Sequence, residues 1–271
     1  MDKPTILLSE ARVREHLKTA SWCDGLHLHC FDSIDSTQTF VKSAIQAQSP
    51  AFKEHVMCCA ETQTQGHGRL GRTWFSPPHQ NLYFSVSWTF RAPFPALSTL
   101  SLVISLALYA LLEEHRLHQD IRIKWPNDLL WRGKKIAGIL IDLMQSTPDT
   151  LHVVIGIGLN VLAHTPSEPE QTAWCSMHDI DPRAFDRNQL LAQCITHLNE
   201  HINCWVKQGF DAFKVRWTAL DALYGQAITV TQRTQKHHGT AQGINAAGEL
   251  LVRDQQGIVH AFLSGEASIQ R

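Results

Sequence analysis

The chain has 271 residues, a formal net charge of −1 at pH 7, 44% hydrophobic residues and 18% charged residues. These values are typical of a globular protein with a sizeable core, and they give no global argument for binding nucleic acid or an anionic membrane. Seven scattered cysteines without metal-type pairing predict reduced thiols and a cytoplasmic protein. We expect no secretory signal, because Met1–Pro4 leads directly into a polar, helix-like stretch. We also expect no membrane span, because the longest apolar run, residues 97–112, is too short to cross a bilayer.

Helices and strands are mixed along the first part of the chain. Hydrophobic periodicity and capping residues predict helices at 9–20, 34–48, 95–118, 187–207 and 210–223. Short apolar runs predict strands at 56–60, 82–88, 121–125, 135–143 and 151–161, and a polar loop is expected at 163–172. After Tyr224, short strand-like pieces alternate with glycines, which is typical of a small β-barrel. We therefore predict two domains, 1–223 and 224–271.

The segment Gly66–Trp74, GHGRLGRTW, is the densest cluster of unusual residues. Its glycines match G-x-G-x-x-G, but a dinucleotide site also needs a following helix and an acidic residue about 20 positions later. The pair Pro77–Pro78 prevents that helix, and residues 72–112 contain no Asp or Glu. Two interpretations of this segment remain, an exposed glycine turn and an anion-binding loop. In the second interpretation, Arg69 and Arg72 supply charge while the glycine backbone lets an anion approach closely.

Four shorter motifs carry polar groups at the ends of predicted elements. Lys124–Asp128 (KWPND) ends a strand in a turn, and Lys135–Leu140 (KIAGIL) begins the next strand with a lysine and carries a glycine inside it. Ile155–Asn160 (IGIGLN) is an apolar strand with two glycines, and Ser36–Gln38 opens a helix. Each has a purely structural interpretation, as a turn, an exposed lysine, a close-packed strand or a helix cap. Each could instead present ligand-binding groups, with the glycines clearing space for a flat ring.

Taken together, these motifs resemble the biotin protein ligase family, also called biotin–[acetyl-CoA-carboxylase] ligase. The family patterns D-S-T, G-R-G-R-x-G-R-x-W, K-W-P-N-D, K-x-A-G-I-L and I-G-x-G-x-N correspond to residues 35–37, 66–74, 124–128, 135–140 and 155–160. The resemblance runs from about residue 30 to the C-terminus. It implies an α+β fold: a class II aminoacyl-tRNA-synthetase-like catalytic domain with a mixed sheet and helices, then a small SH3-like β-barrel. His67 departs from the pattern, since the family usually has arginine there.

The resemblance implies a reaction in two steps. Biotin and ATP, with Mg²⁺, give biotinyl-5′-AMP and pyrophosphate, and a lysine of the biotin carboxyl carrier protein of acetyl-CoA carboxylase then takes the biotinyl group. Bringing a carboxylate to the α-phosphate requires fixed cations that offset the repulsion between two anions. The catalytic residues implied are Arg69, Arg72, Lys135 and Asp128, the last to orient or deprotonate the carrier lysine.

The resemblance also implies two sets of binding residues. The set expected to contact biotin comprises Ser36, Thr37, Gln38, Gln63, Gly66, His67, Gly68, Arg69, Lys135 and Gly138. The set expected on the nucleotide side comprises Arg69, Arg72, Trp74, Lys124, Asn127, Lys135, Asn160 and Trp174. No protein side chain is predicted with certainty to bind the metal ion.

Two alternatives share parts of this pattern. A lipoate or octanoate ligase of the same superfamily would have an equivalent lysine, but the complete arginine loop, the KWPND motif and the C-terminal β domain argue against it. A biotin-sensing repressor would need a DNA-binding domain, for which the residues before Asp35 are too few. We therefore expect no specific nucleic-acid partner. The sequence does not decide between a monomer and a homodimer.

Overall fold

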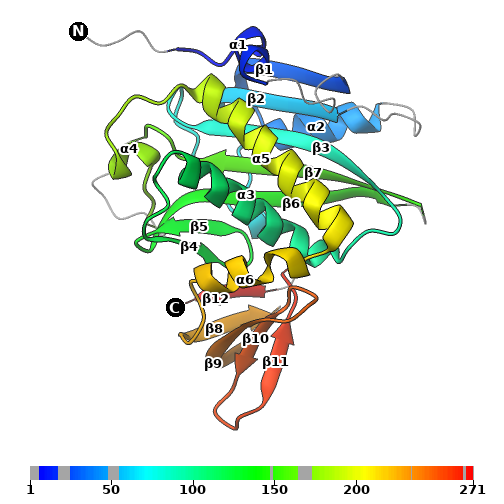
Figure 1. Ribbon diagram of the computed structural model, residues 1–271, viewed down its shortest axis with the longest axis vertical. Coiled ribbons are helices and arrows are strands. Elements are labelled where there is room, and N and C mark those ends of the chain that lie inside the picture. Colours follow the sequence, from blue (N-terminus) through cyan, green and yellow to red (C-terminus); the bar gives the residue numbers. More distant parts are fainter. Residues whose placement is uncertain are drawn as a thin grey trace.

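The computed structural model describes residues 6–17, 25–47, 55–146, 149–163, 173–232, 234–264 and 267–270. Its larger part is built on a seven-stranded mixed sheet with the strand order β1-β2-β3-β7-β6-β5-β4 (Figure 1). Strands β1 and β2 are parallel, and the other neighbouring pairs are antiparallel. The strands are β1 Leu26–Ile34, β2 His55–Gln63, β3 Leu82–Arg91, β4 Ile121–Lys124, β5 Asp128–Trp131, β6 Lys134–Ser146 and β7 Thr150–Leu159.

Helices cover both faces of this sheet. Helices α3 (Leu100–Glu114) and α5 (Arg187–Gln208) lie across one face, and α1 (Glu10–His16) packs against α5 (Figure 1). Helix α2 (Thr37–Gln46) packs against β2, β3 and β7. The alternation of side chains along β2 explains this layering, because Met57 and Cys59 join the large core while their neighbours join a smaller cluster with α2.

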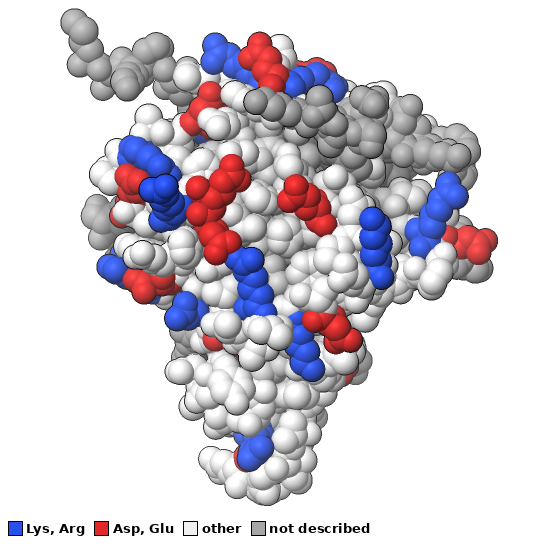
Figure 2. Space-filling view, in the orientation of Figure 1, with Lys and Arg blue, Asp and Glu red and all other residues white. Residues whose placement is uncertain are grey.

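The most apolar segment of the described chain is a core helix. Helix α3 and the preceding 3₁₀ turn, Leu97–Thr99, form a segment long and apolar enough to cross a membrane by composition, yet 67% of it is buried inside the protein. Figure 2 shows acidic and basic side chains interspersed over the face that α3 and α5 cover, without a large area of one sign.

A second, smaller sheet follows helix α6 (Asp211–Leu220). It is antiparallel, with the order β11-β10-β9-β8-β12, and lies beyond β4 and α6 (Figure 1). The Trp125 indole donates to the Gly248 carbonyl at 3.0 Å, and the Ala222 amide donates to the Ile123 carbonyl at 2.9 Å. These bonds join the two parts. The strands are β8 Ala227–Gln232, β9 Gln235–Ile244, β10 Leu250–Arg253, β11 Val259–Phe262 and β12 Ala267–Gln270.

The predicted fold class, a helix-covered mixed sheet followed by a small β domain, is confirmed. Three short or polar elements were not predicted: β1, β5 and α4 (Met177–Ile180). The helix predicted from Ile34 begins at Thr37, because Ile34 is still paired with Gln63 in the ladder of β1 and β2. The helix predicted at 95–118 has its α-helical part at Leu100–Glu114. Residues 18–20, 48 and 164–172 of the predicted elements lie outside the described residues.

Candidate active site

The glycine-rich segment forms a small hairpin between β2 and β3. Its ends are joined by the Trp74 amide, which donates to the Gly66 carbonyl at 2.9 Å, and by the Gly68 amide, which donates to Arg72 at 2.6 Å. The tip is a single 3₁₀ turn in which Leu70 (φ 57°) and Gly71 (φ 72°) are left-handed. No α-helix begins there. The hairpin therefore carries its arginines and its tryptophan back over the sheet.

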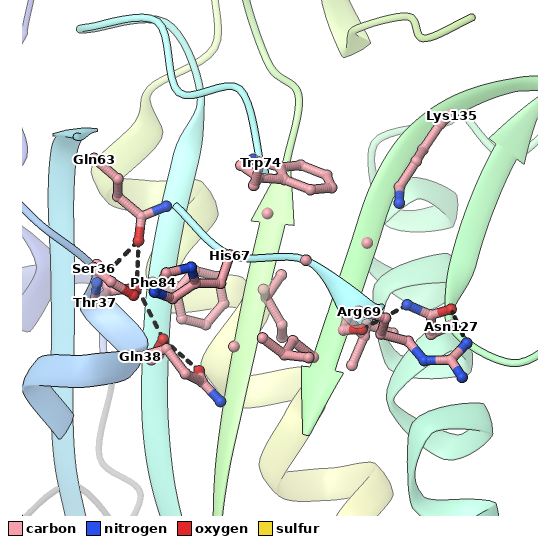
Figure 3. Close-up of a pocket in the computed structure, with 18 residues that line it drawn as sticks. Ser36, Thr37, Gln38, Gln63, His67, Arg69, Trp74, Phe84, Asn127 and Lys135 are labelled. Atoms are coloured by element: carbon pink, nitrogen blue, oxygen red, sulfur yellow. Dashed lines mark hydrogen bonds between the residues drawn. The ribbon is translucent and has the colours of Figure 1, made fainter. Parts of the chain in front are cut away.

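Hydroxyl and amide groups form one wall of a narrow cavity beside this hairpin (Figure 3). The side-chain oxygen of Gln63 accepts from the Thr37 main-chain amide at 2.9 Å and from the Thr37 hydroxyl at 3.1 Å. From β3, Ser85 contacts the Thr37 hydroxyl and donates to the Gln38 side-chain oxygen, both at 2.9 Å. Ser36 also caps α2 by accepting from the Thr39 amide. This wall offers fixed hydrogen-bonding groups to a polar ligand.

The opposite wall is the indole of Trp74, which lies over two strand glycines. A Cβ atom at Gly138 would stand 2.7 Å from the indole, and one at Gly158 would stand 2.4 Å from it. Both positions therefore require glycine for the indole to fit. The remaining cavity is only about 50 Å³, which is room for a few water molecules. A ligand with a fused ring system therefore needs Trp74 to move.

A larger cavity of about 500 Å³ adjoins the first. The two share Gly68, Arg69, Trp74, Asn127 and Lys135 in their walls. Two further tryptophans, Trp125 and Trp174, line the larger one, and Ile269 reaches it from the C-terminal sheet. Aromatic walls beside cations suit a ligand that is part flat ring and part anion.

Lys135 stands where the two cavities meet. The pairing of β5 with β6 shifts by one residue between Leu129 and Leu130, because β6 has a β-bulge there. Such a bulge changes the direction in which nearby side chains point. The ammonium lies 2.7 Å from the Asp128 carboxylate and 4.9 Å from the centre of the Trp74 ring. An anionic ligand that binds Lys135 would therefore compete with Asp128.

Arg69 lines both cavities, as Lys135 does, and is held by both parts of the protein. Its guanidinium donates to the Asn127 side-chain oxygen at 3.2 Å and to the main-chain carbonyl of Ser264, next to β11. Burial lowers the pKa of Arg69, and the negative charge of Asp128 acts in the opposite direction. The group stays protonated at neutral pH, so two cations face the junction of the cavities.

The structure brings together nearly all residues that the sequence singled out. The predicted nucleotide-side residues all line the larger cavity, and the predicted biotin-side residues line the narrow one with one exception. The exception is Gly66, which lies behind the wall, where a Cβ would stand 2.8 Å from the Trp74 carbonyl. Asn160 donates its amide hydrogens to the carbonyls of Lys135 at 3.3 Å and Cys175 at 3.0 Å. These bonds connect the segments of Lys135 and Cys175 in the wall of the larger cavity.

Other wall residues were not assigned from the sequence. Ser85 and Phe84 were predicted only as part of a strand, although a serine inside an apolar run is a weak signal of a polar function. Gly156 makes room for the Gln38 side chain, since a Cβ there would stand 2.3 Å from it. The larger cavity has further unassigned residues: Leu70, Thr73, Phe75, Trp125 and Pro126 lie in or next to the motifs, and Asn81 and Ile269 come from other parts of the chain.

Comparisons with known proteins agree with this architecture. Residues 30–160 match the Biotin/lipoate A/B protein ligase family, and residues 223–269 match the Biotin protein ligase C terminal domain. Among solved structures, the chain resembles the biotin protein ligase from Aquifex aeolicus in complex with biotin and ATP. The TM-score is 0.74 at 28% identity, and the match covers 90% of this chain and 99% of that one.

Curated relatives give the same result. The bifunctional ligase/repressor BirA of Escherichia coli is 32% identical over 249 residues, which are 91% of this chain and 75% of the relative. The biotin–[acetyl-CoA-carboxylase] ligase of Paracoccus denitrificans is 33% identical over 221 residues, which are 77% of this chain and 88% of the relative. The chain therefore belongs to the biotin protein ligase family.

Proposed function

We propose that this chain is an ATP-dependent biotin–[acetyl-CoA-carboxylase] ligase. It activates biotin as biotinyl-5′-AMP with release of pyrophosphate, and it then transfers the biotinyl group to a lysine of a biotin carboxyl carrier protein. One observation carries the proposal: a narrow cavity with amide and hydroxyl groups opens into a wider, tryptophan-lined cavity, and Arg69 and Lys135 stand at their junction. We infer that the carrier belongs to acetyl-CoA carboxylase and that the enzyme works in the cytoplasm.

In this account biotin occupies the narrow cavity. Its ureido group is an array of N–H donors and a carbonyl acceptor, which suits the hydroxyls and amides of Thr37, Gln38 and Gln63. Its fused ring takes the space over Gly138 and Gly158 once the Trp74 indole has moved aside. The carboxylate at the end of its chain then points toward Lys135 and Arg69.

The first step needs a carboxylate oxygen to attack the α-phosphate of ATP. Lys135 and Arg69 offset the repulsion between these two anions and stabilise the charge that develops in the transition state. Arg72 and Lys124 extend the positive lining toward the leaving pyrophosphate, whose Mg²⁺ arrives with ATP as part of the substrate. The described residues contain no group of three or more His, Cys, Asp or Glu side chains that could hold a metal ion on their own.

The second step needs the carrier lysine to lose a proton. Lys135 leaves Asp128 in the first step, when it binds the biotin carboxylate. In the second step the freed Asp128 carboxylate can accept a proton from the carrier lysine or orient its amine. Asp128→Asn is therefore expected to slow transfer from preformed biotinyl-5′-AMP by roughly 10²-fold. Single-turnover transfer to a carrier domain, started with the adenylate already bound, isolates this step from the first one. An unchanged transfer rate would remove Asp128 from the mechanism.

His67 is the position at which this chain departs from the arginine usual in the family. It lines the narrow cavity, and an imidazole carries less positive charge at pH 7 than a guanidinium. His67→Arg is expected to slow dissociation of biotinyl-5′-AMP roughly tenfold, the effect of about 1.4 kcal/mol of added attraction. Stopped-flow displacement measures the rate, with His238→Arg on the C-terminal sheet as the control for added charge. Equal dissociation rates in the wild type and His67→Arg would contradict this role.

The test of substrate class is activation of biotin beside lipoate and octanoate. With each acid and MgATP, pyrophosphate release is measured under identical conditions. We expect turnover with biotin and at most a small fraction of it with the linear chain of octanoate or the dithiolane of lipoate, since neither has a ureido group for Thr37, Gln38 and Gln63. Equal or faster activation of lipoate would assign the chain to the alternative activity.

A further inference from the structure

Two cysteines outside both cavities lie opposite each other on the parallel strands β1 and β2. Cys30 and Cys59 are register partners, and their sulfur atoms are 3.2 Å apart. Neighbouring strands are about 4.8 Å apart, which lies within the range of Cα separations that disulfides span. A disulfide of about 2.05 Å needs the sulfurs to approach by little more than 1 Å. The backbone already holds the two thiols in bonding range.

The two thiols differ in exposure and in acidity. Cys30 is half-buried on the edge strand of the sheet, whereas Cys59 is fully buried. The Cys59 thiol donates to the Cys30 sulfur, and this bond lowers the pKa of Cys30, although burial and the negative charges of Glu10 and Glu61 act in the opposite direction. The same bond, together with burial, raises the pKa of Cys59. Cys30 is thus the accessible nucleophile, and Cys59 is a second thiol already in contact with it.

We propose that Cys30 and Cys59 are an oxidisable dithiol that closes to an intramolecular disulfide with a hydroperoxide. The Cys30 thiolate attacks the peroxide oxygen, the O–O bond breaks, and a sulfenic acid forms as hydroxide leaves. The Cys59 sulfur then attacks the sulfenic sulfur, and the S–S bond forms as water leaves. Overall, two thiols and one hydrogen peroxide give one disulfide and two waters.

The neighbouring Cys58 provides a matched control. It lies one residue from Cys59 on the same strand, but its side chain points to the opposite face, in the cluster that contains Val41 and Val154. Burial raises the pKa of its thiol, and its sulfur contacts only the Cys59 carbonyl among the hydrogen-bond partners described. Its replacement should leave the Cys30–Cys59 pair intact.

The dithiol lies on the two strands that lead into the narrow cavity. Further along the same ladder Ile34 pairs with Gln63, and the Thr64 amide donates to the Ile34 carbonyl at 2.9 Å. Gln63 in turn holds Thr37. The sulfur atoms must still approach by little more than 1 Å to bond, and we propose that the adjustment of β1 and β2 is passed along the ladder to Gln63 and Thr37. This part of the inference rests on the proposed function, and it predicts a higher KM for biotin in the oxidised enzyme with an unchanged KM for ATP.

The experiment treats the full-length protein with hydrogen peroxide and reads its intact mass. The wild type is expected to lose the mass of two hydrogens, to regain it with dithiothreitol, and to give a linked peptide pair that contains Cys30 and Cys59. Cys58→Ser should behave like the wild type. Cys30→Ser and Cys59→Ala should not lose this mass, and unfolding curves of both variants establish that they are folded.

Three results would overturn the proposed dithiol: no loss of mass in the wild type, a gain of oxygen mass in place of the loss of two hydrogens, or a disulfide mapped to any other pair of the seven cysteines. None of these depends on biotin ligase activity, so failure of the dithiol is distinguishable from failure of the proposed function. Oxidised and re-reduced samples are then assayed with biotin. A raised KM that returns on reduction supports the coupling to the cavity, and an unchanged KM overturns that coupling.

Discussion

Replacing Lys135 by methionine is expected to lower the single-turnover rate of pyrophosphate release by about 10²–10³-fold, the effect typical of removing one preorganised electrostatic group from an active site. Methionine keeps most of the length and apolar volume of the side chain but removes the ammonium that faces both cavities. The fold should persist, because Lys135 is partly exposed and its ion-pair partner Asp128 is equally accessible to solvent. Rapid-quench measurement with biotin and MgATP gives the rate.

The adjacent lysine supplies the control for this experiment. Lys134 precedes Lys135 on β6, is exposed, and lines neither cavity. Lys134→Met removes the same charge from nearly the same place and should leave pyrophosphate release close to the wild-type rate. Equal rates for Lys135→Met and Lys134→Met would mean that position 135 has no special part in the first step.

Replacing Arg187 by methionine is expected to lower the free energy of unfolding by about 3–5 kcal/mol, because it removes the guanidinium that is paired with the buried Glu61 carboxylate. Arg187, at the start of α5, donates to the Glu61 carboxylate at 2.5 and 3.2 Å, and the side chains are only 2% and 1% exposed. The guanidinium also donates to the Ile6 and Asn81 carbonyls, and the Leu8 amide donates to Glu61. This network joins the N-terminal segment, β2 and α5.

Urea unfolding curves measure this loss of unfolding free energy, and two further variants serve as comparisons. Arg132→Met breaks an exposed pair with Asp120 and should change stability by no more than about 1 kcal/mol. Adding Glu61→Gln to Arg187→Met removes the unpaired charge and should recover part of the loss. A loss for Arg187→Met no larger than that for Arg132→Met would show that the buried pair contributes no more than a surface pair.

The sequence predicts those site residues that lie in short segments of unusual composition, and it does not predict contacts between separate segments. Arg69, Lys135 and Gly138 lie in short segments whose composition is unusual for a turn or a strand, so their chemistry was visible without coordinates. Asp128 was expected to act on the carrier lysine, but its ion pair with Lys135 depends on the register of β5 and β6, and β5 itself was not predicted. These strands form a hairpin that turns at Arg132 and Gly133, and a bulge in β6 shifts its register, which the sequence did not reveal.

Trp74 and Ser264 illustrate the same limit. The sequence suggested that strand glycines clear space for a flat ring, but it could not show that the tryptophan of the loop fills the space over two of them. Ser264 reaches Arg69 from 195 positions away in the chain, across the two parts of the protein. Glu61 and Arg187 went unassigned for a related reason, since nothing local distinguishes a buried ion pair from two surface charges.

The most direct test of the central claim is to mix the protein with biotin, MgATP and a biotin carrier domain and to measure the intact mass of the carrier. The carrier is expected to gain one biotinyl group on a lysine, and to gain none when ATP is omitted or when Lys135→Met replaces the wild type over the same interval. A carrier that stays unmodified in the complete mixture, beside a positive control ligase that modifies it, would contradict the account.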